Sequence, residues 1–191
     1  MDKIQAIKLK CEYFTNPLGI DEPFPRLSWQ ICQAGRGAFQ SAYRIFVSLS
    51  PLEAASGRGE IWDSGKIAST QCTSIEYRGL PLQSRTRYYW SVLLYDAEGS
   101  CGVLSETAWF ETALMSMDEW QGCWIGMPCV GPSQLIRREF TLEKEIESAR
   151  VYVAGLGYYE LYLNGLKQGV NVLDPGYTNY SERVFYVCLL Y

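Results

Sequence analysis

This 191-residue chain contains no histidine, and the residues that we consider for chemistry are its carboxylates and tyrosines. Without histidine there is no Ser-His-Asp triad, no Cys-His pair and no His-ligated metal. Two carboxyl groups about 6.5–9.5 Å apart across a sugar pocket would support inverting hydrolysis of a glycoside. The candidates in the second half are Glu139, Glu143, Glu145, Glu147, Glu160, Asp174 and Glu182. We interpret the run 143–147 as a solvated face, and the sequence indicates no catalytic residue, cofactor site or metal site.

Tyrosines in the same region are candidate carbohydrate contacts, because a ring with a polar tip suits a wet surface. The candidates are Tyr158, Tyr162 and Tyr177. In an extended strand Tyr158 and Tyr162 share one face with Glu160, while Tyr159 lies on the face that we assign to the core. Packing against the core or a neighbouring domain is the alternative explanation for these rings.

Asp174 is the fourth candidate carbohydrate contact. It lies in "LDPGYT" (173–178), where it precedes a proline and a glycine. Proline pushes the preceding residue towards extended backbone, and glycine gives the freedom for a tight turn. A structural turn is therefore the alternative to ligand contact at Asp174.

The composition is that of a folded, β-rich chain, with 48% hydrophobic and 14% aromatic residues. The net charge of −4 argues against nucleic acid, which requires clustered Lys and Arg. No apolar run approaches the roughly 20 residues needed to span a bilayer, and the N-terminus lacks the apolar segment of a signal peptide. We expect no nucleic-acid or membrane partner, and a cytoplasmic location or a chain from which a secretion signal was removed.

Seven cysteines, an odd number without a CxxC pair, favour buried free thiols over a disulfide framework. Free thiols agree with a reducing compartment.

Alternating polar and apolar residues from 6 to 112 predict short strands separated by turns, as in "AYRIFVSLS" (42–50) and "RYYWSVLLYD" (87–96). The stretch "PLEAAS" (51–56) predicts one helical turn. The pattern breaks between 114 and 122, which predicts a domain at 1–113, a linker at 114–122 and a second domain at 123–191.

In the second domain, "LIRREFTL" (135–142) and the segment after Ala149 predict two strands separated by the charged stretch 143–148. The step Asn164–Gly165 between alternating segments predicts a β-hairpin, because both residues tolerate positive φ.

Residues of the first domain resemble the later strands of a fibronectin type III domain. The shared pattern is Leu82-x-x-x-Thr86-x-Tyr88-x-Trp90-x-Val92, followed by the turn 96–99, Ser105 and "WFETA" (109–113), with Trp29 as the core tryptophan of an early strand. The ring of Tyr88 is expected to be buried, with its hydroxyl bonded to the backbone.

A second and more specific resemblance covers the whole chain. The segments "NPLGID", "PRLSWQI", "QSAYRIFVS", "WDSGKI", "EYRGLPLQSRTRYYWSV", "WIG" and "ARVYVAGLGYYELYLNG…G…VLDPGYTNYSERVFY" resemble the N-terminal region of bacterial α-L-rhamnosidases of glycoside hydrolase family 78. This resemblance implies an all-β chain: a fibronectin type III-like (immunoglobulin-like) β-sandwich followed by part of a jelly-roll-like β-sandwich.

The resemblance also implies that the catalytic acid and base lie on a separate α/α-barrel domain, and no position here matches them. We therefore expect a non-catalytic fragment of a rhamnosidase, inactive by itself, that serves as scaffold or accessory to substrate binding. An independent carbohydrate-binding module is one alternative. The other is an interaction or spacer module that pairs through an exposed sheet edge, including a homodimer through the truncated second domain.

Overall fold

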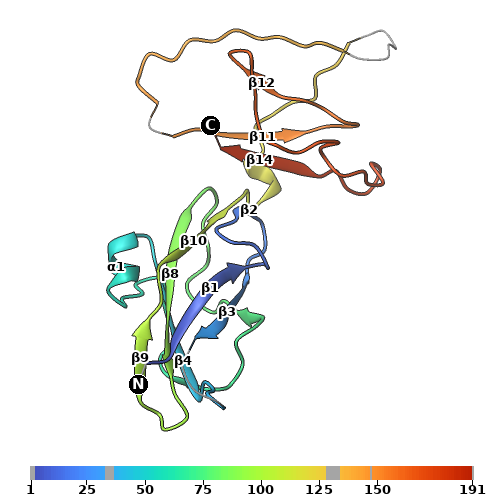
Figure 1. The fold of residues 1–191 in the computed structure, drawn as a ribbon. Coiled ribbons are helices and arrows are strands. Elements are labelled where there is room, and N and C mark those ends of the chain that lie inside the picture. Colours follow the sequence, from blue (N-terminus) through green and yellow to red (C-terminus); the bar gives the residue numbers. More distant parts are fainter. Residues whose placement is uncertain (1–2, 33–36, 128–133, 147, 191) are drawn as a thin grey trace. The chain divides into compact units, whose positions relative to one another are not determined.

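The computed structural model describes residues 3–32, 37–127, 134–146 and 148–190, and it is almost entirely β (Figure 1). The chain forms two compact units, Met1–Ser116 (unit 1) and Met117–Tyr191 (unit 2). The predicted all-β class is confirmed.

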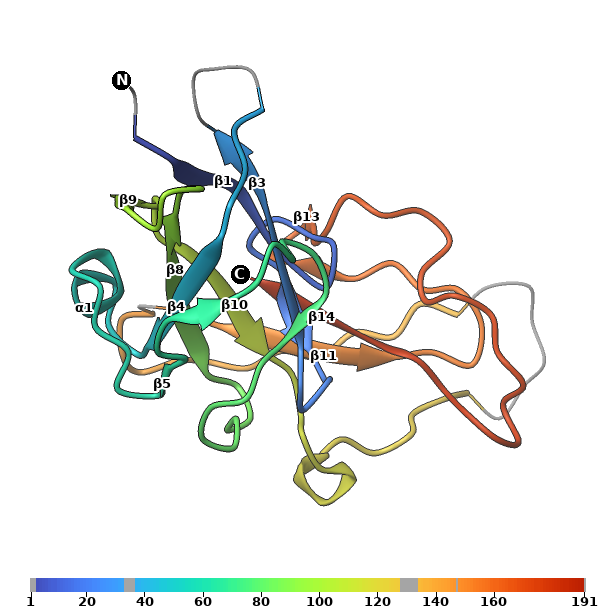
Figure 2. The ribbon, with the colours of Figure 1, turned by 90° about the horizontal axis from the view of Figure 1, so that it is seen from below.

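Unit 1 is a β-sandwich with one short helix. Its elements are β1 (Gln5–Cys11), β2 (Leu18–Ile20), β3 (Arg26–Cys32), β4 (Ala42–Ser48), α1 (Pro51–Ala55), β5 (Trp62–Asp63), β6 (Ile67–Ala68), β7 (Ile75–Glu76), β8 (Arg87–Tyr95), β9 (Cys101–Leu104) and β10 (Ala108–Thr112). The predicted helical turn is α1, which lies beside β4 and β8 (Figure 2).

One sheet of unit 1 contains β1, β3 and β7 in antiparallel pairing. In the other sheet β8 lies between β4 and β10, β2 runs parallel to β10, and β5 and β6 pair with β4. The strand β9 pairs with β8 and also, in parallel, with β1, so it joins the two sheets.

Aromatic rings fill the space between these sheets. Trp90 is fully buried, Trp29 packs edge-on against Tyr43 with ring centroids 5.2 Å apart, and Tyr88 stacks on Phe110 at 5.4 Å. The hydroxyl of Tyr88 accepts a hydrogen bond from the backbone N–H of Gln83 at 2.8 Å, as predicted.

A fully buried glutamine ties the core to a neighbouring loop. Its Oε1 accepts from Nε1 of Trp29 at 2.9 Å, and its Nε2 donates to the carbonyls of Ser69 and Gln71. This residue is Gln40, and it provides the buried indole N–H of Trp29 with a hydrogen-bond acceptor.

Unit 2 contains less regular structure. It has a single-turn 3₁₀ helix, η1 (Met117–Glu119), an antiparallel pair of β11 (Arg150–Ala154) and β14 (Tyr186–Leu190), and a hairpin of β12 (Tyr162–Leu163) and β13 (Leu166–Lys167). The hairpin turn has positive φ at Asn164 (50°) and Gly165 (81°), which confirms the Asn-Gly prediction.

The predicted strand at 135–142 is wrong, because the described residues 134–146 contain no strand. Leu135, Phe140 and Leu142 are exposed there, so their apolar character does not come from a sheet face within this unit. Hydrophobic residues alone do not make a strand without a neighbour to pair with.

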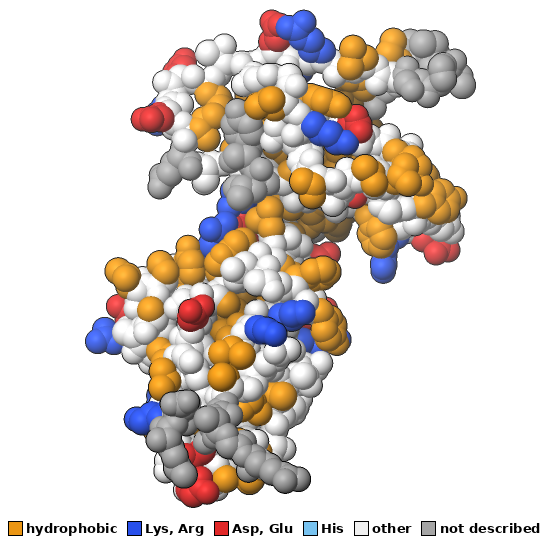
Figure 3. Space-filling view, viewed as in Figure 1, with side chains coloured by type: hydrophobic (Ala, Val, Ile, Leu, Met, Phe, Trp, Pro, Cys, Tyr) orange, Lys and Arg blue, Asp and Glu red, His pale blue; other side chains and the backbone are white. Residues whose placement is uncertain are grey.

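The buried hydrophobic core of the described residues lies entirely in unit 1. Within the described part of unit 2 only Pro175 is buried, and many apolar side chains are exposed, as the space-filling view shows (Figure 3). Unit 1 therefore has the packing of an independent domain, whereas unit 2 does not.

Of the six cysteines in the described residues only Cys11 is buried. The prediction that the cysteines are buried is correct for Cys11 alone. The seventh, Cys129, lies outside the described residues.

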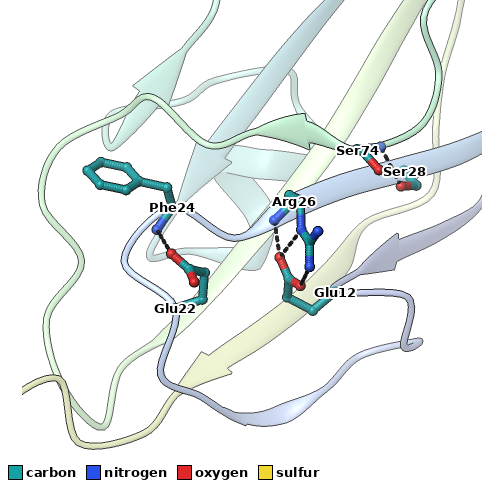
Figure 4. A network of polar contacts seen from close by, with 6 residues as sticks. All are labelled: Glu12, Glu22, Phe24, Arg26, Ser28 and Ser74. Carbon is teal, nitrogen blue, oxygen red and sulfur yellow. Dashed lines mark hydrogen bonds and ion pairs between the residues drawn. The ribbon is translucent and has the colours of Figure 1, made fainter.

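A charged network joins the end of β1 to the start of β3 (Figure 4). The guanidinium of Arg26 donates to both carboxylate oxygens of Glu12, at 3.1 and 2.6 Å, and the backbone N–H of Arg26 donates to Oε1 as well. The ring of Tyr13 lies 5.3 Å from the guanidinium carbon. The contacts with Arg26, foremost its side-chain hydrogen bond, hold the pKa of Glu12 below its ordinary value.

This network predicts a pH-dependent contribution to stability. Because the pKa of Glu12 is lower in the folded chain, its contribution is complete above the unfolded pKa of about 4.3 and is lost as pH falls through the folded value. At pH 7, Glu12→Gln should lower the free energy of unfolding by about 1 kcal/mol in urea titrations. At pH 3 the difference from the unmodified chain should shrink.

The control is Glu98→Gln, which removes the same charge from the exposed turn after β8. It should leave the free energy of unfolding unchanged at both pH values. A Glu12→Gln deficit that is equal at pH 7 and pH 3 would contradict the role of this ion pair.

Candidate carbohydrate contact surface

The β12–β13 hairpin positions a cluster of one tyrosine and two opposite charges. The hydroxyl of Tyr162 donates to Oε2 of Glu160 at 2.8 Å, and Nζ of Lys167 donates to Oε1 at 2.6 Å. The register pairs Tyr162 directly with Lys167 across the hairpin, which explains why both reach the same carboxylate.

These contacts determine the protonation of the cluster. The hydrogen bond from Lys167 is the main cause of a lowered pKa at Glu160, while the same carboxylate raises the pKa values of Tyr162 and Lys167. A general acid in glycoside hydrolysis needs a raised pKa. Glu160 has the opposite shift, so it is suited to accept hydrogen bonds and not to donate a proton.

Asp174 lies inside a turn and does not project from a free surface. Its carboxylate accepts from Nδ2 of Asn171 at 3.0 Å, its backbone carbonyl accepts from the N–H of Tyr159 at 2.9 Å, and its peptide bond to Pro175 is cis. A cavity of about 10 Å³ adjoins Asp174, Tyr159 and Glu160. That volume holds about one water molecule, which is too small for a sugar ring.

The Tyr159 side chain is partly buried, as predicted, although residues 158–161 lie outside any strand and only Tyr162–Leu163 of the expected strand forms β12. Its hydroxyl is buried without a hydrogen-bond partner among the described residues. Burial, and then the charge of Asp174, raises the pKa of this phenol. Tyr159 is therefore a packing residue and not a surface contact.

Tyr177 forms a second aromatic group with Tyr180. Their ring centroids are 5.4 Å apart at 60°, and the Tyr177 side chain is 80% exposed. The loop that carries them is closed by hydrogen bonds from Thr178 to the carbonyl of Arg183 and from the N–H of Arg183 to Asn179.

The four sequence candidates thus lie in different settings. Tyr158 (64% exposed) and Tyr162 (52% exposed) lie on the surface, as their shared face predicts, and Tyr177 is exposed on another loop. Among the described residues no hydrogen bond, ion pair or ring contact joins the hairpin cluster of Glu160, Tyr162 and Lys167 to the Tyr177–Tyr180 pair. The arrangement offers rings for surface stacking, not an enclosed pocket.

A cavity of about 380 Å³ in unit 1 was not indicated by the sequence. It lies between β1 and the residues that lead into β10, and its lining includes Lys8, Asn16 and Glu106. It adjoins a bulge in β1 where Lys8 has φ of 51°. Lysine carries no preference for that backbone conformation, so the sequence contains no signal for the bulge.

The fold and surface together define a β-sandwich of the immunoglobulin class followed by a smaller β unit with exposed aromatic side chains. Residues 6–116 match the family model described as Rha78A-like, N-terminal immunoglobulin domain, and residues 144–189 match that of the alpha-L-rhamnosidase N-terminal domain. The chain belongs to this rhamnosidase N-terminal family, which confirms the resemblance inferred from its motifs.

Relatives support the same assignment. An alpha-L-rhamnosidase of Formosa agariphila is 33% identical over 91% of this chain and 21% of its own length, and one of Alteromonas sp. is 35% identical over 96% of this chain and 21% of its own. The chain therefore spans about a fifth of the length of the curated relatives that it matches.

Two solved structures are similar over nearly all of this chain. The alpha-L-rhamnosidase from Dictyoglumus thermophilum has a TM-score of 0.90 at 35% identity, with 97% of this chain and 23% of that chain covered. The Streptomyces avermitilis alpha-L-rhamnosidase, solved in complex with L-rhamnose, has a TM-score of 0.63 at 28% identity, with coverage of 97% and 20%.

Neither of the described helices, α1 and η1, has the length and apolarity to cross a bilayer.

The hairpin cluster generates a prediction for the Tyr162 phenol. Since Glu160 raises the pKa of Tyr162, Glu160→Gln should lower the midpoint of phenol ionisation towards the ordinary value of about 10. NMR of the tyrosine ring carbons as a function of pH measures this midpoint. The control Glu182→Gln should leave it unchanged, and an unaltered Tyr162 midpoint in Glu160→Gln would contradict the described contact.

Proposed function

We propose that this chain serves as a non-catalytic N-terminal part of an α-L-rhamnosidase, an enzyme that hydrolyses terminal α-L-rhamnosides. Its role there is that of a scaffold or an accessory to substrate binding. The observation that carries this proposal is the match of 97% of the chain to a rhamnosidase structure at a TM-score of 0.90. We further propose domain limits at 1–113 and 123–191, joined by a linker at 114–122.

The carboxylates support the absence of catalysis. The 380 Å³ cavity has one carboxylate in its lining, Glu106, whereas inverting hydrolysis needs two across a sugar-sized space. The cavity beside Glu160 and Asp174 has two, but its volume is only about 10 Å³. The lowered pKa of Glu160 also opposes a role as general acid.

The chain should therefore release no aryl product from 4-nitrophenyl α-L-rhamnoside above the rate in buffer. A full-length α-L-rhamnosidase from one of the relatives provides the positive control. Turnover that copurifies with the chain and is lost in Glu160→Gln or Asp174→Asn would contradict the non-catalytic role.

A second candidate function, binding of rhamnose-containing glycans at the tyrosine surface, is supported by the exposed rings of Tyr158, Tyr162 and Tyr177. The L-rhamnose complex of the Streptomyces relative makes this sugar the natural probe.

Titration with a rhamnose-containing oligosaccharide should change the ring NMR signals of Tyr158 and Tyr162 saturably. Removal of one stacking ring by Tyr162→Ala should weaken binding about fivefold or more, since stacking on a ring contributes on the order of 1 kcal/mol or more. The control Tyr13→Ala removes a similarly exposed tyrosine from unit 1. Unchanged ring signals at saturating sugar would rule out this surface as a glycan site.

A third candidate, association with a second copy through unit 2, is supported by its exposed apolar side chains. Val170 is 97% exposed, and Leu166, Val172 and Leu173 are exposed by two thirds or more. Exposed apolar surface of this kind favours protein contacts.

The free thiols support a further proposal, that the chain is located in the cytoplasm.

Light scattering at increasing concentration should show a monomer–dimer equilibrium for the unmodified chain. The double variant Val170→Asp/Leu173→Asp should shift it towards the monomer, because charges on the contact surface oppose association. The control Leu52→Asp introduces a charge at an exposed leucine of unit 1 and should have no effect. A monodisperse monomer at high concentration would contradict this candidate.

A further inference from the structure

The 380 Å³ cavity of unit 1 forms where two strands depart from regular pairing next to each other. In β1 the register with β3 shifts between Ile7 and Lys10, and Lys8 has a left-handed φ of 51°. On the other side, residues 106 and 107 lie outside both β9 and β10, which appear as separate strands (Figure 1). At both walls the backbone is therefore not engaged in the regular pairing of strands, so its polar groups are available to a ligand.

The floor of this cavity is apolar. Ala6, Leu9 and Ala108 are buried and line it. Its volume is at the lower end of the range of small-molecule sites, about 300–1,000 Å³.

Polar side chains held by the fold form the walls. Nε2 of Gln5 donates to the carbonyl of Leu104 at 3.0 Å, and Oδ1 of Asn16 accepts from the N–H of Trp109 at 3.0 Å. These bonds fix both amides and leave Oε1 of Gln5 as an acceptor and Nδ2 of Asn16 as a donor. The hydroxyls of Thr15 and Thr107, which also line the cavity, add groups that donate and accept.

The exposed residues of the lining carry both signs of charge. Lys8 and Glu106 both line the cavity, and neither forms an ion pair with another described residue. One positive and one negative charge oppose a strongly anionic ligand such as a phosphate ester. They favour a neutral molecule with many hydroxyl groups, which accepts from the ammonium and donates to the carboxylate.

We propose that this cavity binds one neutral deoxyhexose residue, with L-rhamnose as the representative ligand. The C6 methyl group and ring C–H groups pack on Ala6, Leu9 and Ala108, and the hydroxyls bond to Asn16 and Thr107. The choice of L-rhamnose among deoxyhexoses rests on the proposed function in a rhamnosidase. The preference for a neutral sugar with a methyl group rests on the cavity alone.

The test is an amide NMR titration of the full chain with free L-rhamnose. Saturable shifts are expected at the amides of Thr15, Asn16 and Thr107, with a dissociation constant on the order of millimolar for a ligand of this size. Thr107→Val should weaken binding at least about tenfold because it removes a hydroxyl at nearly constant volume. The matched control Thr70→Val changes an exposed threonine outside the cavity and should bind as the unmodified chain does.

L-mannose provides the ligand control, because it carries a hydroxyl at C6 where L-rhamnose has a methyl group. It should bind at least about tenfold more weakly, since that hydroxyl would lie on an apolar floor. Equal binding of the two sugars would overturn the deoxyhexose assignment. Unchanged thermal unfolding of Thr107→Val shows that a loss of binding is not a loss of fold.

The proposal is overturned if the cavity amides do not shift, if Thr107→Val binds as tightly as Thr70→Val, or if the shifts are confined to Tyr158 and Tyr162. These outcomes leave the scaffold role intact. Conversely, hydrolysis of an aryl rhamnoside by the chain would overturn the non-catalytic role without affecting binding in the cavity. The two failures are therefore distinguishable.

Discussion

Burial of Trp90 and its neighbouring rings between two sheets is the constraint on which unit 1 depends. The two sheets close over Trp29, Trp90 and Phe110, and the surface removed from water in this way is the main stabilising contribution to such a fold. Two polar groups carried into that core have hydrogen-bond partners: the hydroxyl of Tyr88 bonds to the backbone, and the indole of Trp29 bonds to Gln40. The indole N–H of Trp90 is buried without a partner among the described residues. Loops and irregular strands, including the walls of the 380 Å³ cavity, are positioned by this rigid centre.

Unit 2 differs because no comparable centre exists among its described residues. The two sheets formed by its described residues have two strands each, and two-stranded sheets are marginally stable without further packing. Hydrogen bonds of the hairpin cluster at Glu160 are exposed and contribute little to stability. The exposed apolar and aromatic side chains are therefore better explained as contact surface than as the core of a free-standing domain.

Local signals with a direct physical cause could be predicted from the sequence. The Asn164–Gly165 turn, the exposure of Tyr162 and the Tyr88 hydroxyl bond follow from backbone preference, strand alternation and the cost of a buried polar group. The strand expected at 135–142 failed because strand formation depends on a pairing partner that apolar residues do not specify. The sequence contains no indication of the cavity or of the bulge at Lys8, because both arise from contacts between segments that are distant in the chain.

Backbone amide hydrogen exchange of the whole chain at neutral pH tests most directly whether stability resides in unit 1. Amides of β4 and β8 should exchange only through global unfolding, and those of β11 and β14 at least about a hundredfold faster, because local opening of unit 2 exposes little buried apolar surface. Equal protection in β8 and β14 would contradict the account, since it would show that unit 2 has a cooperative core of its own.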